Sequence, residues 1–162
     1  MYQTVMVPLD GSELAECVLP HVESIAKGCG VRTVVFVYVV EQAHFPIGTL
    51  SDGGSIFTDK DAARIRKEDD KHNKAAAKKY LDRVIKRSRY DDVNLKAKVI
   101  TGKPAERLAD YAVKNNVDLI VIATHGRSGV SRWVWGSVAD RVMRSACVPV
   151  LMVRAPGCIP GI

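Results

Sequence analysis

The sequence predicts an α/β fold, an open parallel β-sheet with helices on both faces, of the Rossmann-like kind. Short apolar runs rich in β-branched residues alternate along the chain with longer segments in which apolar residues recur at helical spacing. Strand–helix alternation of this kind implies right-handed crossovers and therefore parallel strands. A length of 162 residues, with 47% hydrophobic and 26% charged residues, suits one globular domain. We expect five strands and four helices.

The first strand is expected at Thr4–Leu9, a short apolar run that ends at the turn pair Asp10-Gly11. Ser12 is placed to cap the helix that follows, because a serine oxygen accepts from N–H groups of the first turn. Apolar residues then recur at helical spacing as far as Gly28, where we expect this helix to end. Pro20 falls inside the helix and predicts a lost hydrogen bond or a kink.

The second strand is expected at Val31–Val40, a run typical of a strand that is buried on both faces. Residues Glu41–Thr58 contain proline, glycine and many small polar residues, and they form a loop too long for a simple connection. Such loops are usually lids or insertions. A long helix is expected from Asp59 to just before Tyr90, with one approximate apolar stripe: Ala62, Ile65, His72, Ala76, Tyr80, Val84 and Ile85.

The second half of the chain continues the alternation. Leu95–Thr101 alternates as a third strand, and Pro104 stands where the first turn of a helix tolerates proline. Asp118–Ala123 is expected to form the fourth strand. A last helix at Val138–Cys147 and a last strand at Val148–Val153 complete the series.

The most informative segment joins the fourth strand to the last helix. The strand ends in Ala123-Thr124-His125-Gly126, and Gly136-Ser137 opens the helix after nine intervening residues. N–H groups at a helix start lack intrahelical partners, and the helix dipole adds positive charge there. Glycine lets a phosphate approach the backbone. The segment matches neither the Walker A pattern nor G-x-G-x-x-G, but it predicts a site for a phosphate, and we expect that of a nucleotide.

The chain resembles the universal stress protein family in four segments that occur in the family's order. ATP-binding members carry G-x-x-G, nine residues and then G-[ST], and this chain departs only by having Ala123 in place of the first glycine. Val5–Ser12 is similar to the family's opening strand and P-x-D-x-S turn, Val99–Pro104 to its G-x-P turn, and Val148–Val153 to its closing strand. The resemblance implies strand order 3-2-1-4-5, a nucleotide-binding domain over residues 1–154 and a C-terminal tail over 155–162.

In that order the first and fourth strands lie side by side, so Asp10 and Ala123 converge at the switch point where open α/β sheets bind ligands. The resemblance implies ATP as the ligand, with Mg²⁺ or Mn²⁺. It places three groups of residues at the nucleotide: Pro8, Leu9 and Asp10 at the nucleoside, Val39 at the adenine edge through its backbone, and Ala123, Thr124, His125, Gly126, Arg127, Gly136, Ser137 and Val138 in the phosphate-binding segment.

Several of these roles have alternatives. Asp10 either accepts hydrogen bonds from ribose hydroxyls or caps the turn after the first strand. Gly136-Ser137 either cradles a phosphate or is an ordinary helix cap. His125 has no carboxylate in its loop to orient it, so we expect a positional role rather than a catalytic one.

The expected function is that of an ATP-binding stress-response or regulatory protein in which ATP acts as a structural ligand or switch. The segment offers no evident general base, so at most slow hydrolysis is expected. The alternative is a dimeric partner-binding scaffold whose nucleotide site is degenerate, and Ala123 keeps this alternative open.

Composition and charge disfavour several other classes of function. The net charge of +6 arises largely between Lys60 and Lys98, where basic residues are interleaved with acidic ones and aromatic residues are scarce. This pattern favours a solvated helix face over a nucleic-acid site. The longest apolar run, Val34–Val40, is far shorter than the roughly 20 residues that a membrane span needs. We therefore expect a cytoplasmic protein that binds neither nucleic acid nor membrane.

Cysteines and the last strand complete the expectations. The four cysteines lack C-x-x-C spacing, and Cys17 and Cys147 are expected to be buried as small hydrophobic residues.

The family resemblance places Val148–Val153 at the edge of the sheet, where an uncovered apolar strand tends to find a partner. The resemblance implies a homodimer through this strand, and a further protein partner remains open.

Overall fold

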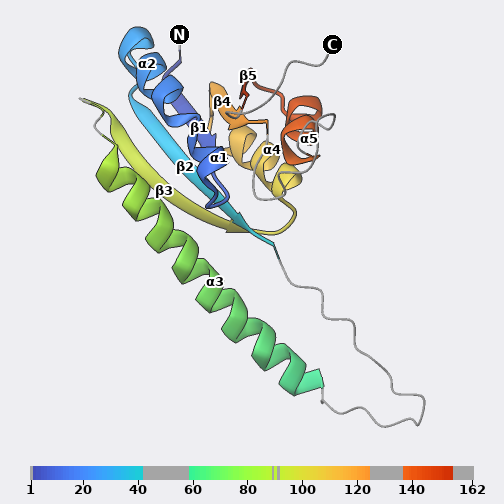
Figure 1. The fold of residues 1–162 in the computed structure, drawn as a ribbon. Helices are drawn as coiled ribbons and strands as arrows, with labels where there is room; N and C mark the ends of the chain where they lie inside the picture. Colours follow the sequence, from blue (N-terminus) through green and yellow to red (C-terminus); the bar gives the residue numbers. More distant parts are fainter. Residues whose placement is uncertain (1, 42–58, 89, 91, 125–136, 155–162) are drawn as a thin grey trace.

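The structure is a computed structural model that describes residues 2–41, 59–88, 90, 92–124 and 137–154. Within these residues five strands form one sheet, in which every neighbouring pair is parallel. The strands are β1 (Thr4–Pro8), β2 (Thr33–Val40), β3 (Asn94–Thr101), β4 (Leu119–Ala123) and β5 (Val150–Val153). Their order is β3-β2-β1-β4-β5, which confirms the predicted fold class and strand order (Figure 1).

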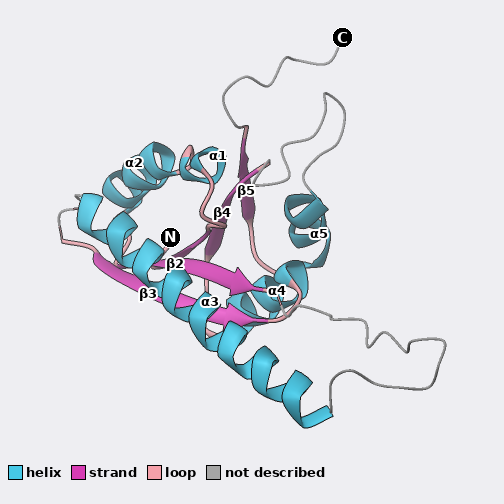
Figure 2. Ribbon diagram, turned by 60° about the horizontal axis from the view of Figure 1, so that its bottom comes forward, coloured by secondary structure: helices cyan, strands magenta, loops and turns pink. Residues whose placement is uncertain are grey.

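Helices cover both faces of the sheet (Figure 2). They are α1 (Glu13–Glu16), α2 (Leu19–Cys29), α3 (Asp59–Arg87), α4 (Pro104–Lys114) and α5 (Ser137–Ser145). The first three pack on one face, hereafter the α3 side, and the last two pack on the other, the α4 side. Successive residues of a strand point to opposite faces, so Val5 and Val7 belong to the α3-side core whereas Met6 belongs to the α4-side core.

The predicted helix between Ser12 and Gly28 is two helices in the structure. Helix α1 ends at Glu16, and α2 begins at Leu19 with Pro20 in its first turn. This arrangement avoids the kink we expected, because the N–H that proline lacks would have had no partner in a first turn. Helix α2 also passes Gly28 and ends at Cys29, where Gly30 adopts the left-handed conformation, φ 63°, that commonly ends a helix.

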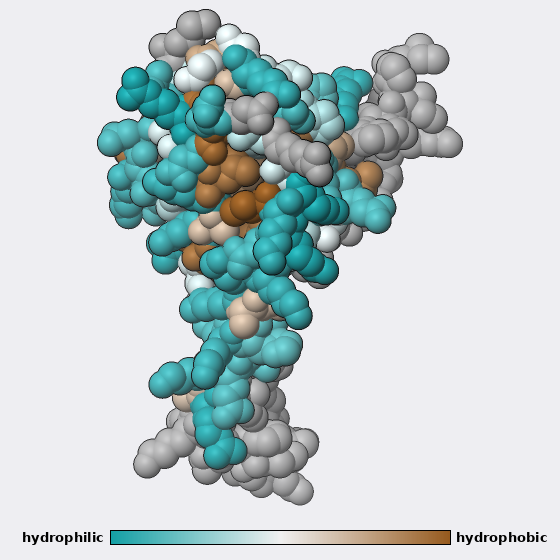
Figure 3. All heavy atoms as spheres, turned by 90° about the vertical axis from the view of Figure 1, so that its left-hand side faces the viewer, coloured by the Kyte–Doolittle hydropathy of each residue, from teal (hydrophilic) through white to brown (hydrophobic). Residues whose placement is uncertain are grey.

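The predicted apolar stripe of α3 is correct near the C-terminal end of the helix and wrong at His72 and Ala76, while the side chains of Ala62 and Ile65 lie outside those that the structure describes. Ala77, Leu81 and Val84 are the buried positions, whereas His72 and Ala76 are exposed. The reason lies in the sheet, because the N-terminal part of α3 runs past the ends of β2 and β3 (Figure 1). The described strands offer no sheet face there to receive an apolar stripe. The projecting part is mostly hydrophilic on the face shown in Figure 3.

The C-terminal elements are shorter than predicted. Helix α5 ends at Ser145 rather than Cys147, and β5 begins at Val150 rather than Val148. Cys147 therefore lies in the connecting turn and is exposed, so the prediction that it is buried is wrong. Cys17 is half-buried and packs against the α3-side core. Among the described residues, no helix has the length and apolar character needed to span a membrane.

Candidate functional site

A cleft of about 820 Å³ opens at the C-terminal ends of the strands, where β1 and β4 are neighbours and the helices that come next in the chain, α1 and α5, pack on opposite faces of the sheet. In an open α/β sheet this switch point is the usual place for a ligand. The predicted site residues that the structure describes all line this cleft: Pro8, Leu9, Asp10, Val39, Ala123, Thr124, Ser137 and Val138. The other four, His125, Gly126, Arg127 and Gly136, lie outside the described residues.

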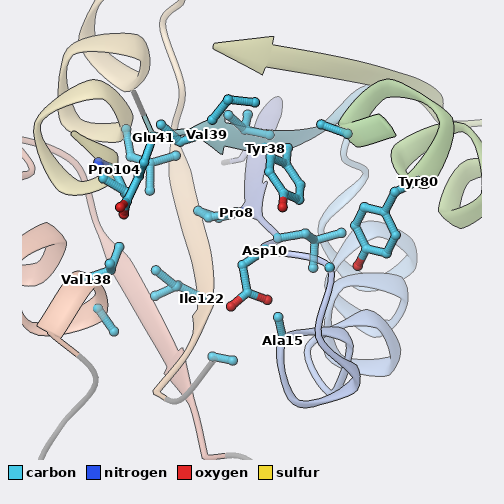
Figure 4. A pocket seen from close by; sticks show the side chains of 18 of the residues that line it. Pro8, Asp10, Ala15, Tyr38, Val39, Glu41, Tyr80, Pro104, Ile122 and Val138 are labelled. Atoms are coloured by element: carbon cyan, nitrogen blue, oxygen red, sulfur yellow. The ribbon is translucent and has the colours of Figure 1, made fainter. Parts of the chain in front are cut away.

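Asp10 lies two residues beyond the end of β1 and stands in the middle of the cleft (Figure 4). One of its carboxylate oxygens, Oδ1, accepts hydrogen bonds from the backbone N–H of Ser12 at 3.0 Å and from the Ser12 hydroxyl at 2.7 Å. The same serine oxygen accepts from the N–H of Ala15 at 3.1 Å and so caps α1. Asp10 therefore has the turn-capping role, and its carboxylate also faces the cleft.

Val39 presents its backbone to the cleft. The N–H of Leu9 donates to the carbonyl of Val37 at 2.9 Å, so the backbone of Val37 faces β1. Backbone groups point to the same side every second residue of a strand, and those of Val39 therefore point the same way. Pro8, the last residue of β1, is already paired with Val37. The donor and acceptor of Val39 thus face the space just beyond the end of β1.

Strand β4 and helix α5 form the opposite wall. The N–H of Thr124 donates to the carbonyl of Val153 at 2.8 Å, and Thr124 is only 6% exposed. The first three residues of α5, Ser137, Val138 and Ala139, line the cleft. The first turn of a helix carries N–H groups without intrahelical partners and a partial positive charge. This wall can therefore receive an anion.

Further residues of the cleft were not identified as site residues from the sequence. Glu41, Pro104 and Ile122 line the part on the α4 side, while Tyr38 and Tyr80 line the part on the α3 side (Figure 4). Strand alternation could have indicated Tyr38, since a neighbour of Val39 must face the other side of the sheet. Tyr80 was predicted only as part of the helix stripe. No sequence pattern brings α3 to this position.

Tyr80 is held by the carboxylate of Glu16, which is held in turn by Arg87. Its hydroxyl donates to Oε1 of Glu16 at 3.0 Å, and Arg87 donates to the other oxygen of Glu16 at 2.8 Å. Burial, together with the hydrogen bond to the Glu16 carboxylate, raises the pKa of the Tyr80 hydroxyl above its ordinary value. The Tyr80 hydroxyl therefore remains a donor to Glu16 at higher pH than an ordinary tyrosine would.

The described residues contain no cluster of three or more histidine, cysteine or acidic side chains that could hold a metal ion. A magnesium ion that is carried by a phosphate does not need such a cluster, because the ion keeps several waters and needs only one or two protein ligands.

Comparison with known proteins agrees with this architecture. A model of the universal stress protein family matches residues 1–154. The chain belongs to this family. Universal stress protein MJ0531 of Methanocaldococcus jannaschii is 30% identical over 156 residues, which cover 96% of this chain and 84% of that protein.

Solved structures show the same fold in other universal stress proteins. The structure of MJ0577, a universal stress protein of Methanocaldococcus jannaschii, superposes with a TM-score of 0.79 at 23% identity and covers 97% of this chain and 99% of that one. A universal stress protein family member from Arabidopsis thaliana, solved with AMP bound, gives a TM-score of 0.61 at 17% identity, covering 96% and 93%. The chain thus has the architecture of a family in which an adenine nucleotide complex is known.

Proposed function

We propose that this universal stress protein binds ATP, together with Mg²⁺ or Mn²⁺, and acts as a nucleotide-dependent stress-response or regulatory switch with little or no catalysis. The observation that carries the proposal is the convergence of three features in one cleft. These are the carboxylate of Asp10, the backbone of Val39 beyond the end of β1, and the first turn of α5.

Each feature suits one part of the nucleotide. The N–H and carbonyl of Val39 match the adjacent acceptor and donor on the edge of adenine, and Pro104 and Ile122 offer apolar walls on the same side. Asp10 is an acceptor for the ribose hydroxyls, since a carboxylate forms strong hydrogen bonds with hydroxyl donors. The phosphates then extend toward Thr124 and Ser137, where the helix start favours negative charge. AMP in the Arabidopsis relative supports the adenine assignment.

The described residues of the cleft include no evident general base for hydrolysis. Cleavage of ATP needs a water positioned at the terminal phosphate and groups that stabilise the charge there. Of the described residues that line the cleft, the acidic ones are Asp10 and Glu41, and none is a histidine. Asp10 is engaged by Ser12 and lies at the proposed ribose position. ATP then acts by binding one conformation of the protein more tightly than another.

Calorimetric titration with ATP and magnesium tests the proposal, with replacement of Asp10 as the decisive variant. Asp10→Ala should weaken ATP by about 10-fold or more, equivalent to roughly 1.4 kcal/mol, and should weaken tripolyphosphate less because that ligand has no ribose. Asp10→Asn is the matched control for damage to the turn, because its amide oxygen still accepts from Ser12 and so preserves the turn.

Two outcomes contradict the proposal in different ways. Equal losses of ATP and tripolyphosphate affinity in Asp10→Ala would place the ribose elsewhere. A folded wild-type protein that binds no ATP at millimolar concentration with magnesium, measured by equilibrium dialysis, would refute nucleotide binding itself and favour the partner-binding scaffold.

The proposal includes a homodimer formed through the segment Val148–Val153. Strand β5, which is part of this segment, lies at the edge of the sheet, and Leu151 is 39% exposed on it. An edge strand offers unpaired backbone groups to a second copy, and a two-fold contact of this kind closes without forming fibres.

A further inference from the structure

The described residues that line the cleft come from both sides of the sheet, and the proposed position of ATP uses only the part on the α4 side. The two parts are called lobes below. The lobe on the α4 side is lined by Val39, Pro104 and Ile122. The lobe on the α3 side is lined by Tyr38 and Tyr80, which lie away from Val39 and Pro104 in Figure 4. The α3-side lobe has no role in mononucleotide binding as proposed above.

Two tyrosines give the α3-side lobe an aromatic wall. The rings of Tyr38 and Tyr80 meet edge to face, with centroids 6.0 Å apart and planes at 71°. Tyr38 lies over the turn after Asp10, because a methyl group added at Gly11 would stand 3.6 Å from its ring. The hydrogen bond from Tyr80 to Glu16, and the ion pair of Glu16 with Arg87, hold the second ring in place. The aromatic wall is therefore preorganised, which lowers the cost of binding a flat ligand.

Helix α3 leaves room in front of these rings. The residues that it contributes to the lobe before Tyr80 include Ala76 and Ala77, which are small, and Arg83 follows one turn later. These positions recur at helical spacing and so share one face of α3. The lobe thus combines aromatic surface, free volume and one positive charge.

Asp10 stands at the junction of the two lobes (Figure 4). In the proposed function this carboxylate accepts from the ribose hydroxyls, so those hydroxyls face the junction. A group attached to the 3′ oxygen of the ribose therefore points into the α3-side lobe, while the 2′ hydroxyl remains available to donate to Asp10.

We propose that the α3-side lobe is a subsite for a second nucleobase, carried by a 3′→5′ linked dinucleotide whose first nucleoside occupies the α4-side lobe. The second base stacks on Tyr38, since every base has a flat face that an aromatic ring can receive. Arg83 supplies positive charge for the phosphodiester between the two nucleosides. This inference rests on the proposed function, because it needs the first ribose at Asp10.

The test compares two ligands that share the first nucleoside and both phosphate positions. 5′-Phosphoadenylyl-(3′→5′)-adenosine carries the second nucleoside, and adenosine 3′,5′-bisphosphate lacks it. Calorimetric titration of the full chain should show the dinucleotide binding about 10-fold or more tightly than the bisphosphate, in line with the contribution of one stacked base. Tyr38→Ala should abolish this difference, and Tyr38→Phe, which retains the ring, should preserve it.

A second variant approaches the lobe from the opposite wall. Ala76 is exposed on α3, so Ala76→Trp should fold normally and fill the space in front of the tyrosines. It should weaken the dinucleotide by about 10-fold while the bisphosphate changes less than twofold. Thermal melts of all variants establish that they are folded. If Tyr38→Ala proves unstable, Ala76→Trp alone tests the subsite.

The outcomes separate this inference from the proposed function. If wild-type protein binds ATP and the bisphosphate but gains nothing from the second nucleoside, the subsite is refuted and the proposed function stands. If Tyr38→Ala or Ala76→Trp weakens both ligands equally, the α3-side lobe serves the mononucleotide and the subsite is again refuted. If wild-type protein binds neither these ligands nor ATP, both proposals fail.

Discussion

Ala123 stands where the ATP-binding pattern of the family has a glycine. The direction of its methyl group decides whether this difference affects ATP binding. Its side chain belongs to the α3-side core together with Val121, whereas Val138 in the first turn of α5 packs on the α4 side. Its φ angle is not among the positive values found in the described residues. The position therefore needs no glycine, and the methyl points away from the proposed phosphate site.

Replacing Ala123 with glycine should consequently leave ATP affinity within about twofold of wild type, while lowering the free energy of unfolding by roughly 0.5–1 kcal/mol because glycine loses more conformational freedom in a strand. Calorimetry and urea denaturation measure the two effects. A gain in affinity of 10-fold or more would mean that the methyl obstructs the phosphates, and would revive the degenerate-site scaffold.

Among the elements, α4 shows how one turn positions a wall of the cleft. Gly102 precedes this helix with φ 132°, a conformation that side chains rarely adopt. A methyl group added there would stand 2.8 Å from Nε of Arg107, which donates to the carbonyl of Thr101 at 2.9 Å. Glycine at this turn lets α4 start beside the end of β3 and bring Pro104 to the cleft.

Gly102→Ala should therefore destabilise the protein by about 1–3 kcal/mol, which lowers the melting temperature by roughly 2–10 °C for a chain of this size. Gly28→Ala is the matched control, because Gly28 lies inside α2 with nothing within 4 Å of an added methyl group. It should instead stabilise by about 0.5–1 kcal/mol. Scanning calorimetry of both variants checks the contrast, and equal melting temperatures would contradict it.

At the scale of the whole molecule, the two edges of the sheet differ. On β3, at one edge, Lys96 and Lys98 are exposed, and charges of this kind discourage pairing with another strand. Strand β5, at the other edge, is entirely apolar, and its Leu151 is among the exposed large hydrophobic residues. This difference between the two edges supports the proposed homodimer through β5.

Leu151→Lys should give monomers or insoluble protein, because a charge at the proposed two-fold contact opposes pairing of the two strands. Val113→Lys is the control, since Val113 is 56% exposed on α4 and lies outside the edge strand. It should leave the dimer intact. Light scattering measures the molecular mass, and a soluble Leu151→Lys protein that is still dimeric would place the interface elsewhere.

The sequence by itself determined the fold class and the position of the cleft. Periodicity is a local property, so the alternation of strands and helices could be read directly along the chain. Asp10 and Ala123 could be placed at one switch point as soon as the family resemblance supplied the strand order. The predicted residues that the structure describes accordingly line one cleft.

Only the tertiary structure decided where each helix is buried and which residues complete the cleft. The buried face of α3 depends on where β2 and β3 end, and the break before Pro20 depends on how the chain packs after Ser12. The pairing of Tyr38 with Tyr80 joins a strand to a helix that follows it after a long insertion. Such contacts arise from the packing of distant segments, and no local pattern of residue types records them.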